Sequence, residues 1–328
     1  MKITYFFRNI KCGYSIQHVF DSVIPEIAQT NEIEIIHVPS PNSMPWDVVK
    51  NAVFTFKNKN KNGINHITGH IHDSILGLWK CKTVVTFHDL VFIDNVKNPI
   101  KRFYKWLFWL YLPVKLADKI TCISTQTKNN VLKYVKTNKL SVIYNPIDPA
   151  YKYSPKKFNK EKPVILHIGT GWNKNLLITI DSLKDISCHL RIVGLLDQEQ
   201  INYLKISNIN YSNVLDLTDQ EIQNEYINCD IVSFVSIYEG FGMPIIEGQM
   251  IGRPVVTSNI EPLLEVGDNA ALFVDPKNVD EIKGAFIKII QDDTFRENLI
   301  VKGQENVRRF DPKIIASQYN DLYKQMLQ

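Results

Sequence analysis

The chain has 328 residues and a mass of 37.9 kDa, with 45% hydrophobic and 22% charged residues, which excludes a disordered polymer, a collagen-like fibre and a polytopic membrane protein. Its five cysteines are scattered and form no C-x-x-C pair, so we exclude a disulfide scaffold and expect a cytoplasmic protein. The net charge of +4 is uneven, because residues 1–150 carry 19 Lys and Arg against 10 Asp and Glu, and the remainder carries 19 against 24. The basic first half predicts an anionic partner, either a phosphorylated acceptor or acidic lipid headgroups. Nucleic acid is not expected, since the basic residues form no runs and no nucleic-acid-binding motif is present.

Short β-branched runs alternate with helical stretches along the whole chain, which is the pattern of parallel α/β sheets. The predicted strands cover residues 2–7, 33–38, 83–87, 119–123, 141–144, 164–168, 190–193, 231–235 and 255–257. Two prolines and a polar stretch interrupt this series in the middle. We therefore predict an α/β protein with two doubly wound, Rossmann-like domains, 1–148 and 163–310, that face each other across a cleft. A linker over 149–162 joins them, and a helix over 311–328 follows.

Three motifs in the first half lie at strand ends, where α/β sheets bind ligands. Gly13 occupies the turn after the first strand, and His88 with Asp89 follows the strand that ends at Phe87. The segment from His66 to Asp73 holds three histidines and a carboxylate, but a strand end followed by a loop of hydrogen-bonding histidines explains it better than a metal site does.

The segment Lys101–Pro113 is the most aromatic part of the chain. Aromatic residues next to cations suit a membrane interface, yet the apolar positions surround the helix almost completely, as in a buried helix. We expect mixed use, with inner positions packed and the basic end near lipid or acceptor. The candidate residues of this surface are Lys101, Arg102, Lys105, Trp106 and Trp109.

Small residues follow the strand that ends at Ile168 and precede a helix. Gly169, Thr170 and Gly171 allow the backbone to approach a diphosphate, and Lys174 offers a point charge to phosphate oxygens. A Gly-x-Gly turn alone is more often an ordinary strand-to-helix connection.

A second glycine-containing turn follows the strand that ends at Val235. Gly240 and Gly242 allow a sharp turn, and Pro244 suits the first turn of a helix whose free N–H groups attract oxygen ligands. Glu247, in the opening turns of that helix, is able to accept hydrogen bonds from a vicinal diol such as ribose.

The stretch EGFGMPIIEGQMIGRPVVTSN, from Glu239 to Asn259, resembles the donor-binding signature of family 4 retaining glycosyltransferases of the GT-B fold (glycosyl transferases group 1). The likeness extends through Glu265–Asp268 and Ala271–Pro276 and back to Leu190–Gly194, and so covers nearly all of the second half. It implies that the final helix crosses back to the first domain.

The resemblance also implies residue roles. Glu247 corresponds to the carboxylate that holds the donor ribose, and Glu239 to the one that reaches sugar hydroxyls near the reacting centre. Gly240, Phe241, Gly242 and Met243 correspond to the backbone donors to the sugar, and His88 to the histidine beside the transferred sugar. Relatives usually add an arginine to the loop that contains Lys174, but Thr170 and Asn173 stand there instead. They also often show two adjacent glycines where this chain has only Gly13.

The expected function is transfer of a sugar from a nucleotide diphosphate sugar to a hydroxyl of a glycan or lipid-linked acceptor, with retention and without a metal or other cofactor. The resemblance suggests bacterial surface polysaccharide synthesis and a cytoplasmic protein that is peripheral on the inner face of the cell membrane. Two alternatives stay open: a nucleotide-sugar epimerase or phosphorylase on the same fold, and a non-catalytic subunit that binds nucleotide sugar.

Overall fold

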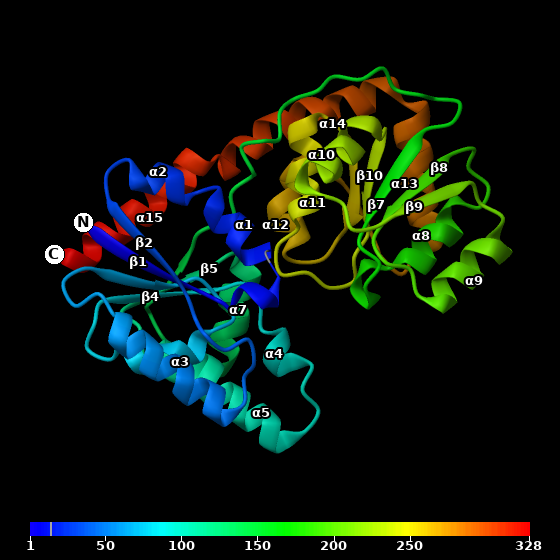
Figure 1. Cartoon of the computed structure of the whole chain (residues 1–328). Helices are drawn as coiled ribbons and strands as arrows, with labels where there is room; N and C mark the ends of the chain where they lie inside the picture. The colour runs from blue at the N-terminus through cyan, green and yellow to red at the C-terminus, as the bar shows by residue number, and fades with distance from the viewer. Residues whose placement is uncertain (14) are drawn as a thin grey trace. The chain divides into compact units, whose positions relative to one another are not determined.

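The computed structural model describes residues 1–13 and 15–328. The chain forms two compact units: unit 1 comprises Met1–Asp148 and Asp311–Gln328, and unit 2 comprises Pro149–Phe310. Each unit contains a six-stranded parallel sheet with helices around it (Figure 1). The predicted α/β class with two doubly wound sheets is confirmed.

The sheet of unit 1 has the order β2-β1-β3-β4-β5-β6. Its strands are β1 Lys2–Phe7, β2 Glu32–His37, β3 Ile64–Ile67, β4 Thr83–Phe87, β5 Lys119–Cys122 and β6 Leu140–Val142. β1 pairs with β2 on one side and with β3 on the other, so the chain reverses its winding direction at the carboxyl end of β1. Ligands bind at such a switch point in open α/β sheets.

Helices cover both faces of this sheet. They are η1 Ile10–Cys12, α1 Ser15–Asp21, α2 Ile24–Ala28, α3 Pro45–Asn58, η2 His72–Leu78, α4 Val91–Asp94, α5 Pro99–Lys105, the π-helical η3 Trp106–Tyr111, α6 Leu112–Leu116, α7 Thr125–Tyr134 and α15 Pro312–Leu327. Alternate residues of β1 separate the two cores: Tyr5 packs with α1, α2 and α15, whereas Phe6 packs with η2, α6 and α7 on the opposite face.

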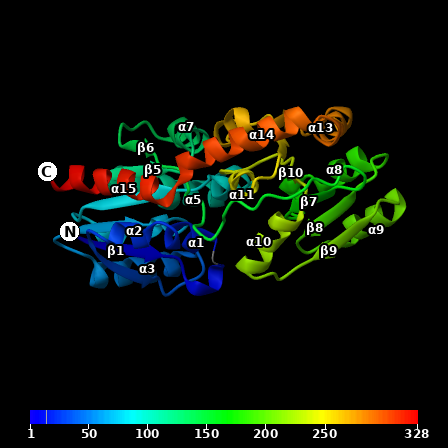
Figure 2. The same cartoon turned by 90° about the horizontal axis from the view of Figure 1, so that it is seen from above.

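The C-terminal helix α15 is part of unit 1 and lies beside α2 (Figure 2). Buried polar groups join it to the sheet: the Tyr323 hydroxyl lies 3.0 Å from the Tyr5 hydroxyl and 2.6 Å from His66 Nδ1, and His66 Nε2 lies 2.7 Å from the Thr86 hydroxyl. Burial lowers the pKa of His66 to about 3, so this imidazole is neutral at physiological pH.

The sheet of unit 2 has the order β12-β11-β10-β7-β8-β9. Its strands are β7 Val164–Ile168, β8 His189–Val193, β9 Tyr211–Val214, β10 Ile231–Phe234, β11 Val255–Ser258 and β12 Leu272–Val274. The helices are η4 Trp172–Lys174, α8 Leu176–Leu183, α9 Gln198–Ser207, α10 Asp219–Asn228, α11 Met243–Ile251, α12 Leu263–Gly267, η5 Asp268–Ala270, α13 Val279–Gln291, α14 Asp293–Asn306 and η6 Val307–Phe310. α11 approaches the sheet closely at Gly248, where a Cβ atom would lie 2.9 Å from a methyl of Val232.

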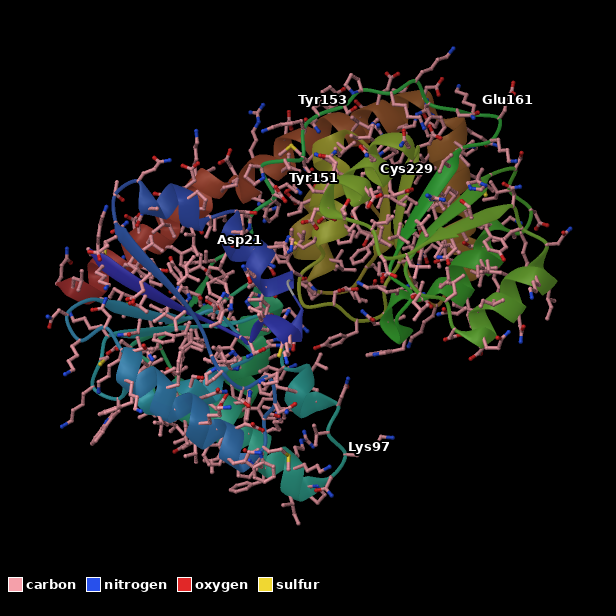
Figure 3. The ribbon with its side chains drawn as sticks, in the orientation of Figure 1. Asp21, Lys97, Tyr151, Tyr153, Glu161 and Cys229 are labelled. Carbon is pink, nitrogen blue, oxygen red and sulfur yellow. The ribbon has the colours of Figure 1, made fainter. Side chains whose placement is uncertain are left out.

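The segment that opens unit 2 packs along the unit's surface, from Tyr151 and Tyr153 to Glu161 (Figure 3). Arg253 is buried and donates to backbone oxygens of Ser154, at 2.9 Å, and of Cys229, at 2.9 Å. Tyr153 leaves no space for a side chain at position 252, where Gly252 has a φ of +86°. Backbone hydrogen bonds and ring packing thus bind residues 151–154 to unit 2.

All nine strands predicted from the sequence are present, with ends shifted by at most a residue or two. Three further strands complete the sheets. The sequence predicted β3 only as a strand end at His66, because the polarity of Asn65 and His66 masks a fully buried strand. β9 and β12, which are short strands at the two edges of their sheet, were not predicted.

Candidate active site

Two loops of unit 2 follow the neighbouring strands β7 and β10. Because these strands are parallel, both loops leave the sheet at the same edge. Ile237 N–H donates to the Asn173 carbonyl at 2.9 Å, and Trp172 stacks on Tyr238 with ring centroids 6.3 Å apart. The two glycine-containing segments that the sequence singled out are therefore adjacent.

Lys174 and Glu239 form an ion pair between these loops. Lys174 Nζ lies 2.7 Å from Glu239 Oε1, and the two side chains are 23% and 13% exposed. The ammonium group also lies 4.6 Å from the centroid of the Phe234 ring, which restricts it further. A cation and a carboxylate are thus held together in a half-buried position at the carboxyl end of the sheet.

Asn173 fixes the position of Glu239, a role that the sequence did not reveal. Its Nδ2 atom donates to Glu239 Oε1 at 3.1 Å and to the Tyr238 carbonyl at 2.9 Å. The sequence marked this residue only as the place of an arginine in relatives. The structure shows that Asn173 joins the loop after β7 to the loop after β10.

Gly169 allows Lys174 to fold back over the loop backbone. Its φ is +88°, and a Cβ atom would lie 3.0 Å from the Lys174 side chain. His167, two residues before Gly169 in β7, is buried. Burial, together with the Lys174 charge, lowers the pKa of His167 to about 4. Among the residues that the structure describes, neither ring nitrogen of His167 has a hydrogen-bond partner.

The neighbouring small residues shape this loop. The Gly171 carbonyl accepts from Lys174 N at 2.8 Å and so closes η4. The Thr170 hydroxyl donates to the Leu195 carbonyl, and the Thr170 carbonyl accepts from Gln200 Nε2 at 2.8 Å. Both residues thus hold the turn in place through local bonds.

Glu247 lies on the second turn of α11, and the buried Tyr226 hydroxyl donates to its Oε2 atom. Burial and the Glu247 charge raise the pKa of Tyr226 well above its ordinary value, so the phenol keeps its proton and acts as a donor. Tyr151 packs edge-on against the Tyr226 ring, at 5.7 Å between centroids. Tyr226 is a second positioning residue that the sequence did not reveal, because it lies 21 positions before its partner.

The turn before α11 leaves the backbone at the N-terminus of the helix uncovered by side chains. Gly242 has a φ of +122°, and a Cβ atom there would lie 2.8 Å from Leu263. Phe241 is buried edge-on against Phe310, while Gly240 and Met243 are half-buried. In residues 1–13 and 15–328, no side chain caps α11. Pro244 has no N–H and Ile245 N donates to the Gly242 carbonyl at 3.0 Å, so the Met243 N–H is the group at the helix start that is placed to bind a ligand.

In unit 1, His88 follows β4 and is buried. Its Nε2 atom lies 2.8 Å from the Thr68 carbonyl, which is only an acceptor, so Nε2 carries the proton. Burial and the His70 charge lower the pKa of His88 to about 4, which leaves Nδ1 as an acceptor at neutral pH. Gly69 allows this contact, because a Cβ atom there would lie 2.5 Å from the His88 ring.

Gly13 ends η1 with a φ of +84° and is exposed. It lies in the turn after β1, beside the switch point of the sheet, where the sequence predicted a ligand contact. The next residue, Tyr14, lies outside the described residues.

The histidines of the segment from His66 to Asp73 do not converge. Both ring nitrogens of His66 bind hydroxyl groups, and His72 Nε2 lies 3.1 Å from the Thr86 carbonyl. His70 lies 3.5 Å from Asp89. In the described part of the chain, no group of three or more His, Cys, Asp or Glu side chains is arranged to hold a metal ion.

The residues predicted to form a membrane or acceptor surface separate into three groups. Lys101 and Arg102 are exposed on α5. Trp106 is half-buried and lines, with Arg102 and Phe103, an apolar pocket of about 280 Å³. Trp109 is only 3% exposed, with Lys105 Nζ 3.8 Å from its ring centroid.

Lys105 and Trp109 instead line a pocket of about 250 Å³ with polar and apolar walls, together with Arg8, His70 and Asp73. Lys105 Nζ donates to the Ser43 hydroxyl at 2.7 Å. Burial raises the pKa of Asp73 to about 7, with Lys105 opposing the shift. The pocket is thus lined by the cations of Arg8 and Lys105, by the Asp73 carboxyl group, which is partly protonated at neutral pH, and by the aromatic ring of Trp109. No helix in the described part of the chain is both long and apolar enough to cross a bilayer.

Comparison with known families gives two adjacent matches. Residues 152–306 match the model of the "Glycosyl transferases group 1" family, and residues 57–151 match "Glycosyltransferase Family 4". The first match contains the loops that follow β7 and β10, and the second contains His88.

Among curated proteins, the chain is 29% identical over 175 residues to O-antigen chain mannosyltransferase B of Escherichia coli, covering 53% of this chain and 40% of that protein. It is 26% identical to the E. coli O-antigen biosynthesis glycosyltransferase WclY, over the full length of both. It is 27% identical to the E. coli UDP-Gal:alpha-D-GlcNAc-diphosphoundecaprenol alpha-1,3-galactosyltransferase, covering 74% of this chain and 69% of that protein. The chain also matches a Methanocaldococcus jannaschii glycosyltransferase. It spans only 40% of the length of the mannosyltransferase and 60% of the length of this archaeal protein.

Two solved structures match almost the whole chain. Sucrose-phosphate synthase from Thermosynechococcus elongatus has a TM-score of 0.82 at 16% identity, covering 99% of both chains. Anabaena HepE, solved in complex with UDP and glucose, has a TM-score of 0.77 at 16% identity, covering 99% of this chain and 100% of that one. The likeness to these structures shows the GT-B fold, and the two family models, which match residues 57–151 and 152–306, show that the chain belongs to the family 4, group 1 glycosyltransferases.

Proposed function

We propose that this chain is a retaining glycosyltransferase that moves a sugar from a nucleotide diphosphate sugar to a hydroxyl of a glycan or lipid-linked acceptor. The observation that carries the proposal is the Lys174–Glu239 pair at 2.7 Å, beside Gly169 and the uncapped start of α11. A cation and backbone N–H groups are able to stabilise the charge of a departing diphosphate, and a carboxylate is able to accept hydrogen bonds from the hydroxyls of a sugar.

Unit 2 binds the donor in this proposal. Glu247, oriented by Tyr226, accepts hydrogen bonds from the ribose hydroxyls. The diphosphate lies against the backbone of Gly169, Thr170 and Gly171, and the sugar receives hydrogen bonds from the backbone of Gly240, Phe241, Gly242 and Met243. Phe241 acts through its backbone, since its side chain is buried against Phe310.

Lys174 and Glu239 act as a preset pair. Negative charge grows on the diphosphate as the bond to the anomeric carbon breaks, and the Lys174 ammonium group stabilises that charge. Glu239 holds Lys174 in position before the donor arrives and accepts bonds from sugar hydroxyls afterwards. Groups fixed in advance need no reorganisation during the reaction, which lowers the barrier.

His88 contributes a neutral imidazole. With its proton on Nε2, it presents Nδ1 as an acceptor for a hydroxyl of the transferred sugar. Neither His88 nor another side chain serves as a covalent nucleophile in this proposal, and no metal or other cofactor takes part.

We place the polar part of the acceptor in the unit 1 pocket that Lys105 and Trp109 line. The cations of this pocket suit a phosphorylated acceptor. Relatives whose names refer to O-antigen and diphosphoundecaprenol substrates support a lipid-linked acceptor in bacterial surface polysaccharide synthesis, at the cytoplasmic face of the membrane. The UDP complex of HepE makes UDP-sugars the first donors to test.

The experiment combines purified chain, a panel of UDP-, GDP- and ADP-sugars, and polyprenyl-diphosphate sugars as acceptors. Mass spectrometry identifies the product, and NMR determines its anomeric configuration. We expect transfer with retention, unchanged by a chelator and strongly reduced in Glu239→Gln and Lys174→Met. Inversion or chelator-sensitive turnover would contradict the finer parts of the proposal.

The same assay separates the alternatives. An epimerase converts the donor without acceptor, and a phosphorylase forms a sugar phosphate with inorganic phosphate. A non-catalytic subunit binds the donor without any turnover. Any of these results would replace the transferase proposal.

A further inference from the structure

Two loops of unit 1 leave the sheet side by side, because β3 and β4 are parallel neighbours. The first loop, after Ile67, contains His70, and the second, after Phe87, contains Asp89. Their side chains meet: His70 Nε2 lies 3.5 Å from Asp89 Oδ2. Asp89 follows His88 directly in the sequence, but the structure pairs its carboxylate with His70. We call these two residues the His70–Asp89 pair.

The backbone of the first loop is held in an unusual conformation. Gly69 has a φ of +136°, and His70 has a φ of +58°, in the left-handed region that few residues other than glycine adopt. Such backbone strain persists where the surrounding structure holds it, and it is concentrated at functional sites. The strained turn brings the His70 ring to the Asp89 carboxylate.

Asp89 is fixed from a second side as well. Its Oδ1 atom accepts from Val91 N at 3.0 Å, at the start of α4. Burial alone would raise the pKa of Asp89, but the hydrogen bond from His70 lowers it below the ordinary value. Asp89 is therefore a carboxylate, which only accepts. This favours the His70 tautomer with its proton on Nε2 and a lone pair on Nδ1.

His70 is the histidine of this edge that a substrate is able to reach. His72 is buried with its ring centroid 4.3 Å from that of Phe87, and His88 is buried with Nε2 on the Thr68 carbonyl. The His70 side chain is 36% exposed instead and lines the pocket of about 250 Å³ in which we place the acceptor. The His70–Asp89 pair therefore gives the wall of that pocket a group that is able to accept a proton.

The pair also adjoins the residue proposed for the transferred sugar. The His70 and His88 ring centroids lie 6.2 Å apart, with an angle of 80° between the rings. In the proposed function, His88 accepts from a hydroxyl of the transferred sugar and the pocket holds the acceptor. A hydroxyl of the acceptor that approaches the anomeric carbon therefore comes within reach of His70.

We infer that His70 is the general base of the transfer, which takes the proton from the acceptor hydroxyl, and that Asp89 orients its ring. The inference rests on the proposed function and deepens it by naming the group that activates the acceptor. A hydroxyl is a weak nucleophile until its proton is removed, and a positioned base typically contributes about 10²- to 10⁴-fold to such a step. Asp89 keeps the lone pair on Nδ1 and stabilises the imidazolium that forms, as carboxylates beside catalytic histidines do.

The step balances without a further reactant. The O–H bond of the acceptor breaks, its proton moves to His70 Nδ1, and an electron pair of the oxygen forms the bond to the anomeric carbon. The bond from that carbon to the diphosphate breaks, and its electron pair leaves on the diphosphate. Asp89 stays ionised beside the new imidazolium, and the exposed His70 ring then passes the proton to solvent.

The test compares single turnovers of the wild type, His70→Asn and Asp89→Asn, with the nucleotide sugar and polyprenyl-diphosphate sugar that the transfer assay identifies. Asparagine tolerates the left-handed backbone at position 70 and keeps a polar side chain, but it cannot take the proton. We expect His70→Asn to slow transfer about 100-fold or more, with unchanged nucleotide affinity. Asp89→Asn retains the Oδ1 atom that accepts from Val91 N and is expected to slow transfer about tenfold or more. His189→Gln, at the amino end of β8 in unit 2, is the matched control and transfers like the wild type.

The pH profile separates a base from a residue that only positions the acceptor. Protonation of His70 removes the lone pair, so wild-type transfer is expected to fall on the acid side, and this fall is absent from His70→Asn. Besides Asp89, the charged or titratable groups that face His70 are Arg8, Cys12, His72, Asp73, His88 and Lys105.

One of these groups titrates in the same range. The pKa of Asp73 is raised to about 7, so Asp73→Asn is measured as well and is expected to keep the fall on the acid side. His72 and His88 have pKa values of about 3 and 4 and stay neutral above about pH 5.5. Circular dichroism checks that each variant is folded at each pH.

A fall on the acid side that survives in His70→Asn would overturn the inference, because another group, such as an oxygen of the departing diphosphate, would then take the proton. So would transfer by His70→Asn at the wild-type rate. Both results leave the transfer itself intact, and they thus differ from failure of the proposed function, in which the wild type transfers no sugar to any acceptor of the panel. That last result would overturn the proposed function and the inference together.

Discussion

The hydrogen bond from Tyr226 to Glu247 gives the sharpest test of how Glu247, the proposed ribose ligand, is held in position. Tyr226→Phe removes one oxygen and keeps the ring, which is buried against Tyr151. Because the acceptor is a carboxylate, the lost bond is expected to lower the free energy of unfolding by about 2 kcal/mol. For a unit of this size that corresponds to a fall in Tm of about 4–8 °C.

The same substitution is expected to weaken nucleotide binding. Glu247 without its buried donor adopts other rotamers, so ribose binding loses about 1–2 kcal/mol, or about 5- to 30-fold in Kd. Isothermal titration with the nucleotide that binds the wild type measures this. Tyr203→Phe is the matched control, since its hydroxyl donates to Asp181 at 2.6 Å on the surface of the same unit. Wild-type affinity in a folded Tyr226→Phe protein would refute the role that we assign to this bond.

Three further predictions concern other contacts. Asn173→Ala is expected to lower kcat about tenfold with little change in nucleotide affinity, because it removes a hydrogen bond to Glu239 but none to Glu247. Steady-state kinetics measure this, and Asn202→Ala is the surface control. Tyr323→Phe leaves Tyr5 and His66 without a shared buried partner and is expected to cost about 2–4 kcal/mol in urea unfolding, whereas Tyr134→Phe, at an exposed hydroxyl, costs less than about 1 kcal/mol. Acidification from pH 7 to pH 5 is expected to destabilise unit 1, because His66, His72 and His88 have folded pKa values of about 3, 3 and 4, below the unfolded value of 6.5. Each contributes stability above pH 6.5 and loses about 1.4 kcal/mol per pH unit below it, while Asp73, with a pKa raised to about 7, offsets part of the loss; unchanged urea midpoints at pH 7 and 5 would contradict this reasoning.

The sequence predicted the architecture well, because buried parallel strands read as continuous β-branched runs. β7 and β10, which precede the two loops of the candidate site, are mostly apolar and rich in Val and Ile. Only the end of β3, at His66, was predicted, because Asn65 and His66 satisfy their polar groups inside the sheet, which a hydrophobicity pattern does not register.

The sequence indicated the candidate residues of the site where they belong to a local motif, but not the contacts between distant motifs. Lys174 and Glu239 were both singled out, but their ion pair, across 65 positions, was not. Asn173 contacts Glu239, and Tyr226 contacts Glu247, in each case between separate elements, so no local sequence pattern indicates either role.

The central claim is that the loops after β7 and β10 form a nucleotide-sugar site with Glu247 on the ribose. A thermal-shift panel of UDP, GDP, ADP and their common sugars, on the wild type and Glu247→Ala, tests it most directly. We predict a rise in Tm with one nucleotide family that Glu247→Ala abolishes. Shifts of equal size in Glu247→Ala, or none with any nucleotide, would contradict the account.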